Sequence, residues 1–276
     1  MRKINYPLIV SDFDGTLVNH DTTISEKNKK AINDYVEAGG KFAISTGRLP
    51  SGILTRAKEL GLKGTIATCQ GAVILDIESG KLISEERIPY VTTLKIVEKM
   101  EELDLHIHLY DLWDFYCNKD DEALKFYESI VRTKAKLVLD KPLSQLVREK
   151  KICAYKLLAM VKSEDNARIF EALSKENFEG CCVTKSDNSL VEVVNAKYSK
   201  GTAVRLLAEL HNIPLEKTVA IGDQQNDIPM IEVAGLGIAV KNADEKLKEK
   251  ADYVSEFTNE EGAVADAIER FGFYEE

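Results

Sequence analysis

Residues 8–16 read LIVSDFDGT, and this stretch decides the expected fold. The short apolar run predicts a strand that ends in two aspartates, Asp12 and Asp14. Because side chains alternate along a strand, the two carboxylates would share one side at its carboxyl end, where open α/β sheets bind ligands. Close carboxylates repel one another, and a hard divalent cation such as Mg2+ offsets that repulsion with oxygen ligands. One carboxylate could then act as a nucleophile while the other handles protons.

The composition limits the kinds of protein that this chain can be. Its 276 residues suit one large domain or two smaller ones, and 44% hydrophobic residues can bury a sizeable core. A net charge of −9 argues against nucleic acid as the main ligand. No apolar run approaches the roughly 18 residues of a membrane span, and a signal peptide is not expected. The five cysteines, without a CxxC pair, indicate reduced thiols and a cytoplasmic protein. The oligomeric state stays open.

The outer sections of the chain alternate strands and helices, which predicts a parallel sheet with helices on its faces. The expected strands are 8–11, 41–45, 65–68, 72–76, 218–221, 237–240 and 253–254. The expected helices are 25–38, 49–60, 200–211, 227–234, 245–250 and 260–270. The middle section instead mixes helices with strands such as 105–109, 114–117 and 154–161. We therefore expect a discontinuous α/β core, 1–81 and 191–276, with an α+β cap domain inserted at 82–190.

Four polar patches each follow a predicted strand or begin a predicted helix. They read DFDGT at 12–16, STGR at 45–48, SKGT at 199–202 and GDQQND at 222–227. Together they supply the parts of a phosphoryl-transfer site, which needs a cation, donors to the phosphoryl oxygens and an in-line nucleophile. The candidate donors are Thr46, the Gly47 amide, Lys200 and Asn226, and helix N-termini behind these loops favour an anion.

The order of these patches resembles the four motifs of the haloacid dehalogenase superfamily of phosphohydrolases. The resemblance is to its Cof-type, sugar-phosphatase-like branch, which inserts a cap between the second and third motifs, and it covers nearly the whole chain. It implies a Rossmann-like core. It also implies that Asp12 is the nucleophile that forms an aspartyl-phosphate, while Asp14 serves as general acid and then as general base.

The same resemblance implies the remaining roles of the site. Mg2+ would be held by the Asp12 carboxylate, the Asp14 backbone carbonyl and Asp223, with Asp227 supporting the loop or a metal-bound water. The phosphoryl oxygens would be held by Thr46, Gly47, Lys200 and Asn226. The branch often has Asn-Gly-Ala where this chain has Gln70-Gly71-Ala72, a departure that bears on substrate fit.

Two features of the middle section remain as candidates. His106 and His108 lie two apart, which can suit a metal, but only Asp104 and Asp111 suggest themselves as further ligands, so a solvated strand is the expected reading. Asp187-Asn188 falls in a predicted hairpin turn and is a candidate for substrate contact.

The function expected from these observations is a Mg2+-dependent phosphatase that hydrolyses small phosphorylated metabolites, such as sugar phosphates, through an aspartyl-phosphate. A phosphomutase or a specialised sugar-phosphate hydrolase would use the same four motifs. A non-catalytic metabolite-binding protein on the same scaffold is the alternative from another class, although both aspartates of the first motif are present.

Overall fold

The computed structural model describes residues 2–131 and 133–274, without the side chains of Ser186 and Asp187. The chain divides into two compact units. The first, here called the core unit, comprises Met1–Gly47, Arg56–Ser84 and Tyr198–Glu276. The second, the insert unit, comprises Arg48–Thr55 and Glu85–Lys197. Among the residues described, no helix is both long and apolar enough to cross a bilayer.

An eight-stranded sheet forms the centre of the core unit. Its strands, in spatial order, are β14 (Tyr253–Val254), β13 (Leu236–Ala239), β12 (Thr218–Gly222), β1 (Leu8–Asp12), β2 (Lys41–Ser45), β3 (Thr65–Thr68), β4 (Val73–Asp76) and β5 (Leu82–Glu85). The strands from β14 to β3 run parallel, and β4 pairs with β3 in the antiparallel sense. β1 lies between β12 and β2, with Val10 beside Ala220 on one side and Ala43 on the other. The first three residues of β1 are completely buried, as a central strand requires.

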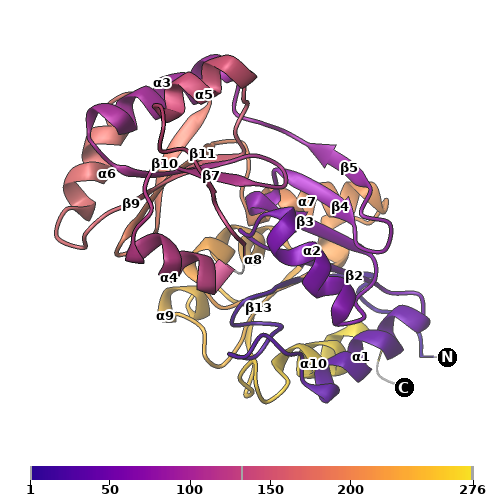
Figure 1. The fold of residues 1–276 in the computed structure, drawn as a ribbon. Coiled ribbons are helices and arrows are strands. Elements are labelled where there is room, and N and C mark those ends of the chain that lie inside the picture. Colours follow the sequence, from indigo (N-terminus) through magenta and orange to yellow (C-terminus); the bar gives the residue numbers. More distant parts are fainter. Residues whose placement is uncertain (1, 132, 275–276) are drawn as a thin grey trace. The chain divides into compact units, whose positions relative to one another are not determined.

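The core unit also contains helices and short helical turns. They are α1 (Glu26–Glu37), α2 (Pro50–Glu59), which spans a unit boundary, α7 (Lys200–Leu210), α8 (Ile228–Val233), α9 (Glu245–Lys248) and α10 (Ala263–Ala267). Short helical turns η1 (Cys69–Gly71), η2 (Leu215–Lys217), η3 (Gln225–Asp227) and η4 (Ile268–Gly272) complete the unit. α1 lies beside α10, and α7 contacts α8 and strands β2, β3 and β12 (Figure 1). Ser25 and Ser199 cap α1 and α7 by accepting the amides of Asn28 and Thr202, both at 3.2 Å.

The insert unit is built on a six-stranded sheet. In spatial order its strands are β10 (Cys181–Asp187), β11 (Leu190–Asn195), β9 (Lys156–Met160), β6 (His106–Tyr110), β7 (Phe115–Cys117) and β8 (Lys136–Leu137). Its helices are α3 (Tyr90–Glu102), α4 (Glu122–Val131), α5 (Leu143–Lys150) and α6 (Asn166–Ser174). α3, α5 and α6 cover one face, where Ile107, Leu157 and Val191 join a single apolar cluster (Figure 1). β11 belongs to this sheet and continues past the expected boundary at residue 190. The α/β fold with an α+β insertion is confirmed.

The opposite face of this sheet corrects one expectation. His106 and His108 are buried rather than solvated, because α4 packs on this face and places the Tyr127 ring 4.8 Å from the His108 ring. The two aspartates suggested by the sequence pair with other residues: Asp104 pairs with Lys119, and Asp111 pairs with Arg87.

Candidate active site

The candidate site lies at the carboxyl ends of two neighbouring parallel strands of the core unit. β1 ends at Asp12, and β12 ends at Gly222 directly before Asp223. Since Ser11 pairs in register with Ile221, the two aspartates reach the same edge of the sheet. β1 pairs with β12 on one side and with β2 on the other, so the strand order switches at β1, and open α/β sheets bind ligands at the carboxyl edge of such a switch point.

Three carboxylates converge at this edge. Asp12, Asp223 and Asp227 are buried, and one oxygen from each lies within 4.8 Å of the others. Lys200, the first residue of α7, is only 2% exposed and reaches into the group. Its Nζ lies 2.6 Å from Asp12 Oδ1 and 2.5 Å from Asp227 Oδ1. Two of the three buried carboxylates, Asp12 and Asp227, therefore share one ammonium group.

Asp227 organises the loop that follows β12. Its Oδ2 accepts the backbone amides of Asp223 and Gln224, both at 2.9 Å, while Oδ1 binds Lys200. The turn is tight enough to need glycine at position 222, because a Cβ there would lie 2.5 Å from Asp227 Cβ. The supporting role expected for Asp227 thus has a geometric basis in loop shape and lysine placement.

Asp223 is fixed by contacts that sequence reasoning did not single out. Thr16 Oγ1 donates to Asp223 Oδ1 at 2.6 Å, and Gln224 Nε2 donates to Oδ2 at 3.1 Å. Gly15 adopts φ +77° and leaves no room for a side chain, since a Cβ would meet Asp223 Oδ2 at 2.5 Å. Asn242 Nδ2 donates to the Gly15 carbonyl at 2.9 Å. Thr16 and Gln224 lie inside the first and fourth motifs, which was the local signal for this arrangement.

Burial and mutual proximity shift the pKa values of the charged groups in this cluster. Burial, followed by the neighbouring Asp227, raises the pKa of Asp12 well above its ordinary value against the opposing effect of Lys200. Burial also raises the pKa of Asp223. For Lys200, burial alone would lower the pKa, but Asp12 and Asp227 raise it by more. Ionised carboxylates would exceed the single ammonium in charge, and this excess of oxygen ligands fits a hard divalent cation.

The second motif forms the neighbouring wall of the site. Thr46 is buried, and its amide donates to the Ala67 carbonyl at 2.9 Å while its carbonyl accepts the Gln70 amide at 3.1 Å. Gln70 adopts φ +58°, and its Nε2 lies 2.8 Å from the place where a Cβ on Gly47 would stand. The Gln70 side chain therefore packs directly on Gly47, so its identity affects the shape of this wall.

The remaining predicted site residues are less closely gathered. Asp14 is partly buried, and its backbone forms an isolated β-bridge with Val18. Its carboxylate is not part of the group of three. Asn226 is exposed in η3. Asn188 is exposed in the turn between β10 and β11 of the insert unit, and the Asp187 side chain lies outside the described residues.

Comparisons with known proteins agree with this architecture. The model of a family described as haloacid dehalogenase-like hydrolase matches residues 9–268. The Bacillus subtilis (strain 168) protein YxeH is 31% identical over 267 residues, which cover 95% of this chain and 97% of YxeH. The 5-amino-6-(5-phospho-D-ribitylamino)uracil phosphatase YcsE of that organism is 29% identical over 282 residues, covering 96% of this chain and 95% of YcsE. The crystal structure of TM0651 from Thermotoga maritima superposes with a TM-score of 0.85 at 32% identity, covering 96% of this chain and 97% of that one.

Proposed function

Because the chain belongs to the haloacid dehalogenase-like hydrolases and is a phosphatase of their Cof-type branch, we propose that it hydrolyses small phosphorylated metabolites in a Mg2+-dependent reaction. Sugar phosphates are the proposed substrate class. The observation that carries the proposal is the group of three buried carboxylates and one buried lysine at the carboxyl edge of β1 and β12.

In the proposed reaction Asp12 attacks the phosphorus atom, forming an O–P bond as the bond to the leaving alcohol oxygen breaks. Asp14 gives its proton to that oxygen. Asp14 then takes a proton from a water molecule, whose oxygen attacks phosphorus and breaks the bond to Asp12, so that inorganic phosphate leaves and the carboxylate is restored. The bonds made and broken in both steps involve only these two carboxyl groups, the phosphate ester and water.

The other residues would hold charge in place during these steps. Mg2+, bound by the Asp12 and Asp223 carboxylates and the Asp14 carbonyl, would offset the repulsion between a carboxylate and a phosphate anion. Lys200 already lies within 2.6 Å of the proposed nucleophile and would neutralise a phosphoryl oxygen. Asp227 keeps that ammonium in position through its 2.5 Å contact. Thr46, the Gly47 amide and Asn226 would donate to the phosphoryl oxygens.

Substrate choice is proposed to depend on two places. YcsE, by its name, acts on a phosphorylated ribityl compound. This similarity supports the proposal that the present chain also acts on a small phosphorylated metabolite. Gln70, packed on Gly47, is proposed to shape the phosphate end of the substrate site. The insert unit, expected as the cap at 82–190, is proposed to select the leaving group, with Asp187 and Asn188 as candidate contacts.

The test is hydrolysis of p-nitrophenyl phosphate with Mg2+, with EDTA, and by the Asp12→Asn variant. The matched control is Asp34→Asn, which makes the same chemical change on the exposed face of α1. We expect turnover only with Mg2+, its loss in Asp12→Asn and its retention in Asp34→Asn. Undiminished activity in EDTA would contradict the metal requirement, and activity in Asp12→Asn would contradict the nucleophile. Product analysis on a sugar-phosphate panel then separates free phosphate from the isomer that a mutase would make.

A further inference from the structure

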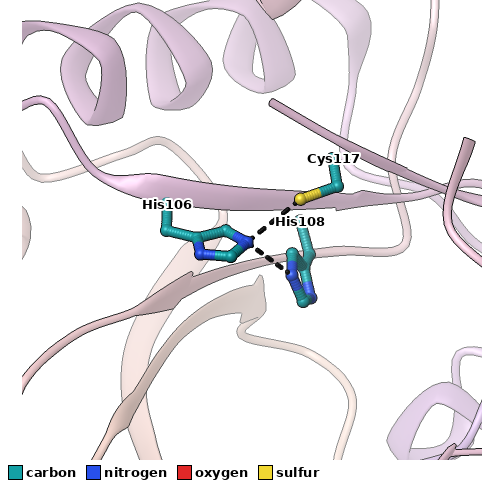
Figure 2. Close-up of side chains that lie close together, drawn as sticks. All are labelled: His106, His108 and Cys117. Carbon is teal, nitrogen blue, oxygen red and sulfur yellow. Dashed lines mark hydrogen bonds between the residues drawn. The ribbon is translucent and has the colours of Figure 1, made fainter. Parts of the chain in front are cut away.

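Three potential metal ligands meet in the insert unit, apart from the carboxylates of the core unit. His106 and His108 project from one face of β6, and Cys117 on β7 pairs directly opposite His108 in the antiparallel register. Figure 2 shows His106 Nε2 between the other two groups, 3.1 Å from Cys117 Sγ and 3.2 Å from His108 Nε2. All three side chains are buried, and their ligand atoms lie within 4.8 Å of one another.

The spacing of these atoms is close to that of ligands around one zinc ion. Bond lengths of about 2.0–2.1 Å to nitrogen and about 2.3 Å to sulfur in a tetrahedron separate two nitrogens by about 3.3 Å and a nitrogen from sulfur by about 3.6 Å. The distance between the two histidine nitrogens here is 3.2 Å, and that from His106 to sulfur is 3.1 Å. Widening the His106–Cys117 contact by about 0.5 Å would bring this pair to zinc spacing, and all three ligand atoms already lie within 4.8 Å of one another.

Asp121 directs the lone pair of His106 toward this point. Its Oδ2 lies 3.2 Å from His106 Nδ1, and its Oδ1 accepts the Leu124 amide at 2.9 Å at the start of α4. A carboxylate acceptor fixes the proton on Nδ1, which leaves the Nε2 lone pair facing Cys117 and His108. Metal-binding histidines commonly have this second partner, which orients the ring and increases its basicity.

The residues around His108 orient its Nε2 atom toward His106. The rings of Phe115 and Tyr127 pack 5.0 Å and 4.8 Å from its own, and Nδ1 has no hydrogen-bond partner among the residues described. Its polar contact in the cluster is therefore through Nε2.

We propose that His106, His108 and Cys117 bind a thiophilic transition-metal cation, with Zn2+ as the best match. Two imidazoles and a thiolate suit Zn2+, whereas Mg2+ prefers oxygen ligands and belongs to the carboxylate site of the core unit. On binding, the S–H bond of Cys117 breaks and its proton goes to solvent, while the proton of His108 moves from Nε2 to Nδ1. The sulfur and the two freed Nε2 lone pairs then form the bonds to the metal.

The charges around the cluster favour a divalent ion. Zn2+, the Cys117 thiolate and the Asp121 carboxylate sum to zero, so the buried metal would not be left with an unpaired charge. The buried ammonium of Lys156, whose charge acts on His108, is paired with Glu192 at 3.0 Å. The His106 side chain keeps 7% exposure and the neighbouring Asp121 side chain is 44% exposed, so solvent reaches this side of the cluster. By joining β6 to β7 ahead of α4, the metal would act as a clip within the insert unit.

The test is a Co2+ titration of the full-length protein in excess Mg2+, which occupies oxygen-ligand sites. A charge-transfer band between thiolate and Co2+ arises only where a cysteine binds the metal, so the carboxylate site cannot produce it. We expect one equivalent of Co2+ to give the band, Zn2+ to displace it, and mass spectrometry to find one zinc per chain after gel filtration. Asp12→Asn is expected to keep the band, which separates this site from the proposed phosphatase site.

Matched variants locate the site. Cys117→Ser should abolish the band and His108→Gln should weaken Co2+ binding at least tenfold, whereas Cys182→Ser and His211→Gln should bind as the wild type does. A wild-type protein without the band would overturn the proposal and leave a hydrogen-bonded cluster only. A band that persists in Cys117→Ser would overturn it too. Circular dichroism shows whether each variant folds, and the wild-type titration tests the proposal even if a variant does not.

Discussion

The replacement Lys200→Met tests most directly how far the buried ammonium stabilises the three neighbouring carboxylates. Lys200 is 2% exposed and lies 2.6 Å from Asp12 and 2.5 Å from Asp227, and both carboxylates are buried, so bulk solvent replaces the lost partner poorly. Breaking a buried ion pair by removing one partner costs about 3–5 kcal/mol. We therefore expect the free energy of unfolding in EDTA to fall by about that amount, and part of the loss to be recovered in Mg2+.

Turnover should respond as well, because the same ammonium would neutralise a phosphoryl oxygen. Loss of one preorganised contact of this kind typically lowers the rate by about 10²–10³-fold. The assays are urea unfolding followed by circular dichroism, in EDTA and in Mg2+, and hydrolysis of p-nitrophenyl phosphate. The matched control is Lys30→Met, whose ammonium also lies 2.5 Å from a carboxylate, that of Asp34, but is 77% exposed. An exposed i,i+4 pair contributes about 0.3–0.5 kcal/mol. Equal urea midpoints in EDTA for the two variants would refute the reasoning.

Three further predictions concern the core unit. Asp12→Asn should abolish turnover while its circular dichroism spectrum stays that of the wild type, and a spectrum of an unfolded chain would mean that the carboxylate is needed for folding instead. Gly222→Ala should destabilise the protein by about 1–3 kcal/mol and lower turnover, because its Cβ would stand 2.5 Å from Asp227 Cβ; an unchanged urea midpoint and rate would show that the turn tolerates the methyl group. Burial raises the pKa of Tyr35, so above pH of about 10 the unfolded chain loses a proton that the folded protein keeps, and stability should fall by about 1.4 kcal/mol per pH unit. Urea midpoints between about pH 9 and pH 11 should fall less steeply in Tyr35→Phe, and parallel slopes would speak against the assignment.

Several expectations from the sequence are now confirmed, and others stay predictions. The family resemblance is confirmed by the match over residues 9–268, and the α/β core with an α+β insertion is confirmed by the two sheets. The expected domain boundaries, the roles of Asp12 and Asp14, the need for Mg2+ and the cytoplasmic location stay predictions. The expected solvated strand at His106 and His108 was wrong, because the packing of α4 against that strand is a tertiary contact.

The sequence by itself determined those features that depend on neighbouring residues. An apolar run ending in Asp12 and Asp14 marks a buried strand and its polar end, since strand periodicity repeats every two residues. In the same way, Ser199 marks the start of α7, because an N-cap hydrogen bond spans only three residues.

Only the tertiary structure decided which distant side chains meet. Thr16 binds Asp223 because β1 and β12 pair in a fixed register, although 207 positions separate the two residues. Cys117 joins His106 because the β6–β7 register sets it opposite His108. Registers and helix packing arise from burial of the whole apolar surface, which no short segment specifies, and so these contacts are visible only in the folded chain.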